Sequence, residues 1–223
     1  FLAALGASTA LCAPVPAEKT EKRDTIPIAR VPDVPPPSRE TLDASIRKAA
    51  DFLLKEQNRD GSWGNHTRTK GLNVLCPYPE GPRSFRTAST SLCVIGLLTS
   101  PLKEDPTVKA SLYKALQYLL TTLPTLKRGD TRTVLGVWGH AYGLSALSRA
   151  ARNLPADAPL REELKKVASL QVKALDQMAD VQGGWGYYTF ETFSKRPIGE
   201  PTSFLTATVL LAYKDSEQAF GLK

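Results

Sequence analysis

Hydrophobic and polar residues alternate in two different patterns along the chain, and both patterns have the period of an α-helix. In the amphipathic pattern, apolar residues recur at every third or fourth position, which predicts a helix with one buried stripe. The first such segment spans 41–56, and its stripe consists of Leu42, Ile46, Ala49 and Leu53. Asp105, followed by a proline, starts a second segment, and Pro159 starts a third.

Three other segments contain almost no charged residues. They span 87–99, 138–148 and 202–213, and each follows one of the amphipathic segments. A helix that is apolar all round is expected to be buried on all sides. The order of the segments therefore predicts an all-α protein of three helical hairpins, in which uncharged helices form an inner layer and amphipathic helices an outer layer.

A short motif recurs where the two helices of each hairpin meet. All three tryptophans of the chain lie in the pattern Gly-x-Trp-Gly, and a glutamine precedes two of them. The residues of this structural motif are Gln57, Gly61, Trp63, Gly136, Trp138, Gln182, Gly183 and Trp185. Glycine permits turns of positive φ, tryptophan covers the junction with a large flat surface, and glutamine bonds helix-end groups. We expect the three tryptophans to occupy equivalent positions, with Trp63 and Trp185 buried.

The first copy of the motif resembles the QW motif of squalene and oxidosqualene cyclases. The matching residues are Lys48, Ala49, Phe52, Leu53, Gln57, Gly61 and Trp63. The resemblance extends over most of the chain and implies membership of the prenyltransferase/squalene-oxidase repeat superfamily, whose fold is an α/α toroid. Three hairpins make only part of such a ring. The resemblance therefore implies that missing C-terminal repeats or a partner chain close the toroid.

The sequence lacks the motifs that give these relatives their activity. Protonating cyclases carry an Asp-x-Asp-Asp cluster, which does not occur in this chain. Protein prenyltransferases bind zinc, but the histidines and cysteines here have no ligand-like spacing, so no metal site and no cofactor are predicted. The catalytic residues are therefore unassigned, and whether the protein is an enzyme stays open.

In the toroid fold, residues at the starts of the inner helices ring one mouth of the central cavity. The candidates for this rim are Phe85, Arg86, His140, Tyr142, Tyr187, Tyr188 and Phe193. An aromatic-lined cavity suits an apolar ligand of the isoprenoid type, and aromatic faces can stabilise cations. Alternatively, these aromatics pack one repeat against the next, and His140 is an ordinary core histidine.

Two other functions stay open beside an isoprenoid-binding toroid. One is a non-catalytic module that binds a protein or a polysaccharide. The other is a polysaccharide lyase of the toroid type, which needs basic residues and carboxylates that the uncharged inner segments do not offer.

The residues before the helices suggest export. Residues 1–17 match the apolar and small-residue parts of a secretory signal, with cleavage after Ala17. Acylation at Cys12, or a frayed helix of a larger domain, are the alternatives. Residues 18–38 form a Pro-rich linker, and 39–223 form the partial toroid domain. This order predicts a bacterial envelope protein, periplasmic or extracellular. Because the chain begins at Phe1, we expect it to be a piece of a longer protein.

Composition and charge add mainly exclusions. The chain has 223 residues, of which 42 % are hydrophobic, and a formal net charge of +7. Its 29 Lys and Arg residues are scattered, which does not predict nucleic-acid binding. No apolar run reaches about 18 residues, so no transmembrane segment is predicted. Cys76 and Cys93 form either a disulfide or free thiols, one of them buried in an apolar helix.

Overall fold

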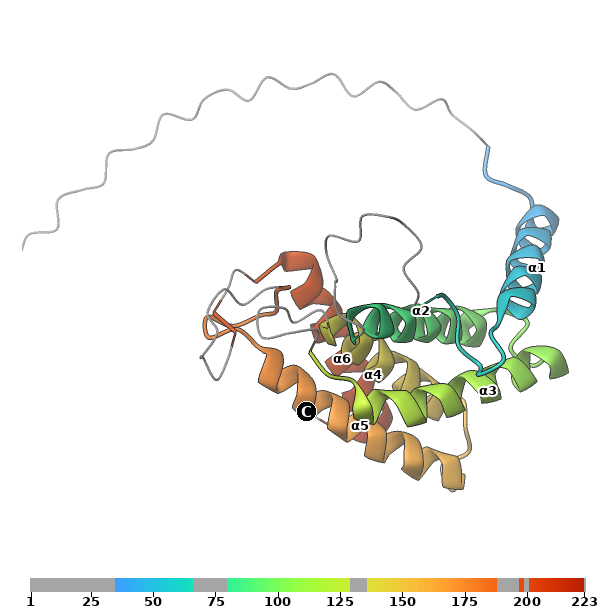
Figure 1. Cartoon of the computed structure of the whole chain (residues 1–223). Coiled ribbons are helices and arrows are strands. Elements are labelled where there is room, and N and C mark those ends of the chain that lie inside the picture. The colour runs from blue at the N-terminus through green and yellow to red at the C-terminus, as the bar shows by residue number, and fades with distance from the viewer. Residues whose placement is uncertain (1–34, 66–79, 129–135, 188–196, 199–200, 223) are drawn as a thin grey trace, which may run out of the picture. The chain divides into compact units, whose positions relative to one another are not determined.

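The computed structural model describes residues 35–65, 80–128, 136–187, 197–198 and 201–222. Within these ranges every regular element is helical and no strand occurs, which confirms the all-α fold class (Figure 1). The elements are α1 (Arg39–Glu56), α2 (Glu80–Thr99), α3 (Pro106–Thr122), the short 3₁₀ helix η1 (Leu123–Thr125), α4 (Gly136–Arg152), α5 (Pro159–Met178) and α6 (Ser203–Phe220). They belong to one compact unit, Ser38–Lys223.

The helices begin where the sequence places start signals. Asp105 caps α3, because its Oδ1 accepts hydrogen bonds from the backbone N–H groups of Thr107 at 2.8 Å and Val108 at 3.4 Å. Pro159 is the first residue of α5. Both starts satisfy or remove backbone donors that a first helical turn leaves without a partner. The last helix, α6, ends at its C-cap residue Gly221, which has a left-handed backbone conformation with a φ of 69°.

The helices pack in two layers. In the inner layer, α4 packs against both α2 and α6. In the outer layer, α3 packs against α2 and contacts α1 and α5, while α5 packs against α4 (Figure 1). The predicted order of alternating outer and inner helices is therefore confirmed.

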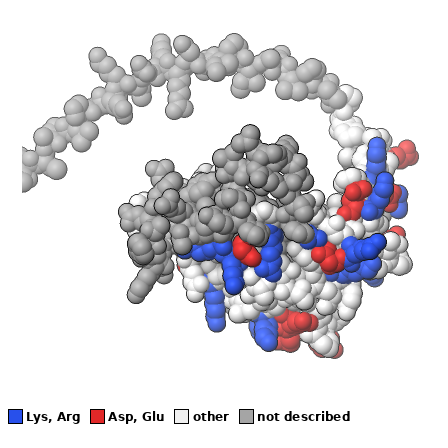
Figure 2. Space-filling view, in the orientation of Figure 1, with Lys and Arg blue, Asp and Glu red and all other residues white. Residues whose placement is uncertain are grey.

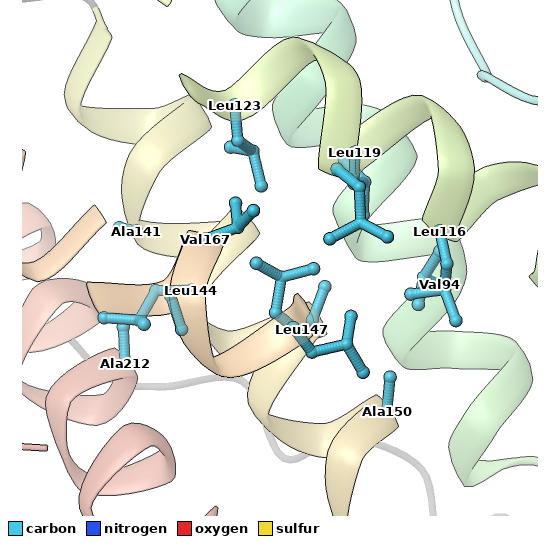
Figure 3. Packing of buried hydrophobic residues seen from close by; sticks show 14 of the residues in the cluster. Val94, Leu116, Leu119, Leu123, Ala141, Leu144, Leu147, Ala150, Val167 and Ala212 are labelled. Carbon is cyan, nitrogen blue, oxygen red and sulfur yellow. The ribbon is translucent and has the colours of Figure 1, made fainter. Parts of the chain in front are cut away.

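The core lies where the two layers meet. Leu116 and Leu119 of α3 approach Leu147 of α4 and Val94 of α2, as Figure 3 shows. Leu119, Leu147 and Val94 are completely buried. Burial of a leucine or valine side chain stabilises a fold by about 1.5–3 kcal/mol, so this junction supplies much of the stability.

Burial on all sides is confirmed for α4 and wrong for the other two inner helices. Phe85 and Leu92 of α2 are exposed, as are Phe204, Leu210 and Leu211 of α6. The reason is that α4 has an inner helix on each side, whereas α2 and α6 each have α4 on one side only among the described residues.

The predicted stripe of α1 is also less buried than expected. Ala50 is the only buried residue of this helix, and Leu42 is exposed. Ile46 and Leu53 are partly buried, while Ala49 is exposed. The stripe has little to pack against, because α1 meets α3 over a short stretch only and contacts the other described helices even less.

Charged residues lie mainly on the surface, and the described exceptions include the buried carboxylates of Asp180 and Asp215. Asp215 of α6 is buried and accepts hydrogen bonds from Arg149 Nε at 2.9 Å and Arg152 Nη2 at 3.1 Å. Both arginines belong to α4, so this cluster ties the C-terminal halves of two inner helices together. On the face shown in Figure 2, basic and acidic side chains are intermixed with neutral surface.

Candidate functional site

The first and third tryptophan motifs are built in the same way. Trp63 and Trp185 are only 4 % and 8 % exposed, which confirms that both are buried. The indole Nε1–H of Trp63 donates to the carbonyl of Leu53 at 2.7 Å, and that of Trp185 to the carbonyl of Leu175 at 2.8 Å. Each tryptophan is thereby fastened to the outer helix that precedes it.

The backbone around these two tryptophans matches as well. The N–H of each tryptophan donates to a threonine hydroxyl of the following inner helix, Thr90 or Thr206, at 3.0 Å in both motifs. The glycine two positions before each tryptophan has positive φ, 88° at Gly61 and 92° at Gly183. At Gly61 a Cβ would also collide with the Lys114 carbonyl of α3. The motif thus joins outer helix to inner helix and is structural in both copies.

Gln57 strengthens the first motif by linking α1 to α3. Its Nε2 donates to the carbonyls of Gly61 at 2.9 Å and Ser111 at 3.0 Å. Its Oε1 accepts from the Ser111 hydroxyl at 2.9 Å. The residue therefore bonds helix and turn carbonyls, the role that its residue type suggests.

The assignment of Gln182 to the same role is wrong. Gln182 is exposed, and its backbone N–H donates to Asp180 Oδ1 at 2.8 Å. The tryptophan–leucine hydrogen bonds set the register of the third motif, and they put Ala179, the C-cap residue of α5, at the position of Gln57. Lys173 and Ala174 resemble Lys48 and Ala49 of the first copy, but they lie three residues after the positions that this register matches.

The second motif is not equivalent to the other two. Gly136, Val137, Trp138 and Gly139 are the first residues of α4 and have helical geometry. Gly136 therefore makes no positive-φ turn, because the helix begins at the residue where the other copies turn. Trp138 is partly buried and projects from the start of an inner helix. The expectation of three equivalent tryptophans is wrong for this one.

Trp138 instead lies at the centre of an aromatic cluster, which we define as Trp138, Tyr142, Tyr187 and Phe204. The Trp138 ring stacks on Tyr142 at 5.5 Å and an interplanar angle of 13°, and on Phe204 at 6.0 Å and 19°. Tyr187 is tilted against Trp138 at 5.9 Å and against Phe204 at 5.9 Å. These separations are typical of favourable aromatic pairs.

The aromatic cluster joins the N-terminal ends of two inner helices and remains accessible. Phe204 is 53 % exposed, and the other three rings are partly buried. Tyr142 and Tyr187 are two of the predicted rim residues, and the structure brings them together. Phe204 was not among the predicted rim residues, and no spacing in the sequence connects it with Trp138.

The other rim candidates lie elsewhere. Phe85 of α2 is exposed. Arg86 pairs with Asp60 at 2.9 Å and lies over the ring of Tyr118, with 5.6 Å from Cζ to the centroid. It therefore links α2 to the first motif and to α3. Tyr188 and Phe193 lie outside the described residues.

His140 lies in the core between α4 and α5 and is away from open surface. Its Nδ1 is 2.7 Å from Gln171 Oε1, and the Gln171 Nε2 donates to the Val167 carbonyl at 3.1 Å. An amide oxygen only accepts, so we assign the imidazole proton to Nδ1. The Nε2 atom is buried and has no hydrogen-bond partner in the structure.

Burial controls the protonation of His140. Loss of solvation lowers the pKa of the imidazole below its ordinary value of 6.5, and the hydrogen bond to Gln171 partly opposes this shift. The side chain is therefore neutral at physiological pH. Gln171, which fixes the tautomer from the outer helix, was not anticipated by the sequence analysis.

The described residues contain no group of three or more His, Cys, Asp or Glu side chains placed to bind a metal ion. None of the helices found in these ranges has the length and apolar character needed to cross a membrane. Cys93 is a free thiol, and burial raises its pKa to about 11. Cys76, with which the sequence allows Cys93 to form a disulfide, lies outside the described ranges.

No model of a known protein family matches the chain, and no solved structure matches it significantly.

Proposed function

We propose that this chain is part of an exported toroid-type repeat protein that binds an apolar, isoprenoid-type ligand on the aromatic cluster. The observation that carries the proposal is the stack of Tyr142, Trp138 and Phe204 at the starts of α4 and α6, which stays accessible at Phe204. A structural staple needs no such exposure, as the buried Trp63 and Trp185 demonstrate.

The shape of the cluster suits an elongated hydrocarbon. The rings of Trp138, Tyr142 and Phe204 are nearly parallel, and with the tilted ring of Tyr187 they form one apolar surface. The hairpin that contains α4 and the hairpin that contains α6 both contribute to it. Contact with such a surface removes apolar area of the ligand from water, at about 25 cal/mol per Å². The ring faces also attract cations, which suits a ligand that develops positive charge.

Binding is proposed without cyclisation of the ligand. Protonation of an isolated alkene needs a strong, desolvated acid, which proteins usually make by crowding carboxylates. The one pair of adjacent glutamates in the sequence, Glu162 and Glu163, is exposed near the start of α5. We expect the purified chain to yield no cyclic product from squalene.

Titration with farnesol and squalene, followed by tryptophan emission and calorimetry, tests the proposal. Removing one ring of the cluster, in Phe204→Ala or Tyr142→Ala, should raise Kd about 10-fold or more, because a buried aromatic contributes at least about 1.5 kcal/mol. Leu170→Ala is the matched control, since Leu170 is also an exposed apolar residue but belongs to the outer helix α5. In Trp138→Phe the ligand-induced change in emission should disappear.

Three results would contradict the proposal. The first is the absence of binding to either lipid, and the second is an equal loss of affinity in the control variant. The third is binding of soluble oligosaccharides in preference to the lipids, which would favour the polysaccharide-binding alternative.

A further inference from the structure

The outer helices α3 and α5 lie close together at one end and diverge towards the other. The 3₁₀ helix η1, which follows α3, contacts α5, and in Figure 1 the two helices separate from there towards the right, where both begin. A pocket of about 320 Å³ lies between the diverging ends. Residues at the C-terminal end of α4 line this pocket from the inner layer.

The walls of the pocket are apolar and come from α2, α3, α4 and α5 or from residues that directly follow them. Leu112, Leu116 and Ala150 are buried, and the partly buried members are Leu98, Leu154 and Leu160. Because four consecutive helices supply these walls, the pocket forms inside the row of hairpins. It therefore does not depend on the open faces of α2 and α6.

The charged side chains at the rim leave one positive charge in excess. Lys103 and Lys109 are positive, and Glu104 is negative. Lys109 Nζ lies 2.7 Å from Glu104 Oε2, and its hydrogen bond and charge lower the pKa of Glu104, so these two opposite charges compensate each other. Lys103 forms no ion pair with a carboxylate in the part of the chain that the structure describes, so the excess charge is that of Lys103.

Asn153 holds Lys103 at the mouth of the pocket. The Asn153 Nδ2 donates to the Arg149 carbonyl of α4 at 2.9 Å, which directs its Oδ1 towards Lys103. Lys103 Nζ donates to this Oδ1 at 3.1 Å. An ammonium group has three N–H donors, and this hydrogen bond uses one of them. Lys103 can therefore donate to a ligand while it stays bound to Asn153.

We propose that this pocket binds a small amphipathic anion, an alkyl chain of medium length that ends in a carboxylate. The chain lies between the leucines of the walls, and the carboxylate accepts hydrogen bonds from the Lys103 ammonium. A volume of about 320 Å³ is at the lower end of the range of roughly 300–1,000 Å³ that is typical of ligand pockets. It suits one short chain and is too small for a lipid with two long chains.

This site is separate from the aromatic cluster. Trp138 lies in the first turn of α4, and Asn153 directly follows the last residue of this helix. At a rise of about 1.5 Å per residue, the two residues are roughly 20 Å apart along the helix axis. The two sites can therefore be tested independently, and this inference does not rest on the ligand proposed for the aromatic cluster.

The test titrates the full chain with octanoate, octan-1-ol and octylamine, and follows the amide signals by NMR. The three probes share one alkyl chain and are negative, neutral and positive at neutral pH. Octanoate should bind with a Kd of about 1 mM or tighter, within the range open to such a small ligand. The alcohol should bind at least about 3-fold more weakly, and the amine more weakly still. Octanoate should shift the amides of Leu112, Leu116 and Leu154.

Two rim variants should change the affinity in opposite directions. Lys103→Met keeps the stem and removes the charge, so octanoate should bind at least about 3-fold more weakly while octan-1-ol is unaffected. Glu104→Gln removes the negative charge, so octanoate should bind about 2-fold more tightly and octylamine more weakly. Lys165→Met, at an exposed position of α5 outside the pocket, is the matched control. Phe204→Ala should leave the octanoate affinity unchanged.

Four results would overturn the proposal. One is the absence of saturable octanoate binding up to about 5 mM, well above the expected Kd. Another is binding of octylamine that equals or exceeds that of octanoate, which would exclude an anionic ligand. The third is an equal effect of Lys103→Met and Lys165→Met. The fourth is a set of octanoate-induced shifts centred on Trp138 and Phe204, which would place the ligand on the aromatic cluster instead.

Discussion

Replacing Trp185 by alanine probes the structural motif most directly. The indole is 8 % exposed, and its Nε1–H donates to the Leu175 carbonyl at 2.8 Å. Loss of a large buried aromatic costs about 3–5 kcal/mol, and the carbonyl left without its donor keeps the cost at the upper end of that range. A domain of this size has a total stability of about 5–15 kcal/mol, so the expected loss is a large part of it.

Three further variants serve as comparisons for this cost. Trp185→Phe keeps an aromatic ring and loses the donor, so it should cost about 1–3 kcal/mol, the price of a buried group left unsatisfied. Trp138→Ala should cost only about 1–2 kcal/mol, because that ring is partly exposed at the start of α4 and makes no equivalent staple. Trp63→Ala, in the equivalent motif, should match Trp185→Ala.

Urea unfolding followed by far-ultraviolet circular dichroism measures these differences as changes in the free energy of unfolding. Protein concentration should be low, so that association does not add to the apparent stability. A loss of less than about 1 kcal/mol in Trp185→Ala, the range of ordinary surface substitutions, would contradict the structural role of the buried tryptophan. An equal loss of stability in Trp138→Ala and Trp185→Ala would contradict the difference between the two motifs.

Three other predictions concern titratable groups. The pKa of His140 lies below 6.5 in the folded state, so the unfolded chain binds a proton more readily than the folded chain does. The free energy of unfolding should therefore fall as the pH drops through about 6.5, by at most about 1.4 kcal/mol per pH unit. Urea unfolding of His140→Gln between about pH 5.5 and 7.5 should lack this part of the slope. Asp215→Asn should lower the free energy of unfolding in urea by about 1–3 kcal/mol, because it weakens the contacts with Arg149 and Arg152. The control Glu163→Gln, at an exposed position, should change it by less than about 0.5 kcal/mol. Cys93, with its pKa raised to about 11, should react with iodoacetamide much more slowly in the folded chain than in urea, as mass spectrometry at pH 8 would show.

Most of the fold could be predicted because helical periodicity and start signals are local. Asp105 and Pro159 mark helix starts that the structure confirms. Exposure of the inner-helix flanks could not be predicted in the same way. Leu210 and Val94 have similar neighbours in sequence, and they differ only because α4 covers one and not the other.

The site was predictable only in part, for a related reason. Tyr142 and Tyr187 follow tryptophans at inner-helix starts, which the repeat pattern reveals. Phe204 joins them through contacts between distant parts of the chain, and such contacts leave no local signal. The Gly-x-Trp-Gly pattern also misled, because it does not encode whether its first glycine turns, as Gly61 does, or begins a helix, as Gly136 does.

The sparse packing of α1 has a consequence for the order in which the protein opens. This helix buries only Ala50 and is held mainly at its C-terminal end, by Trp63 bonding to Leu53 and Gln57 bonding to Ser111. A segment with few buried apolar contacts has a low local stability and opens before the rest of a domain. The amides in the first turns of α1 therefore exchange with solvent in a small, independent fluctuation, while those of α4 exchange only when the whole domain unfolds. We therefore expect unfolding to begin at α1, and we expect α4 to be the last helix that remains folded.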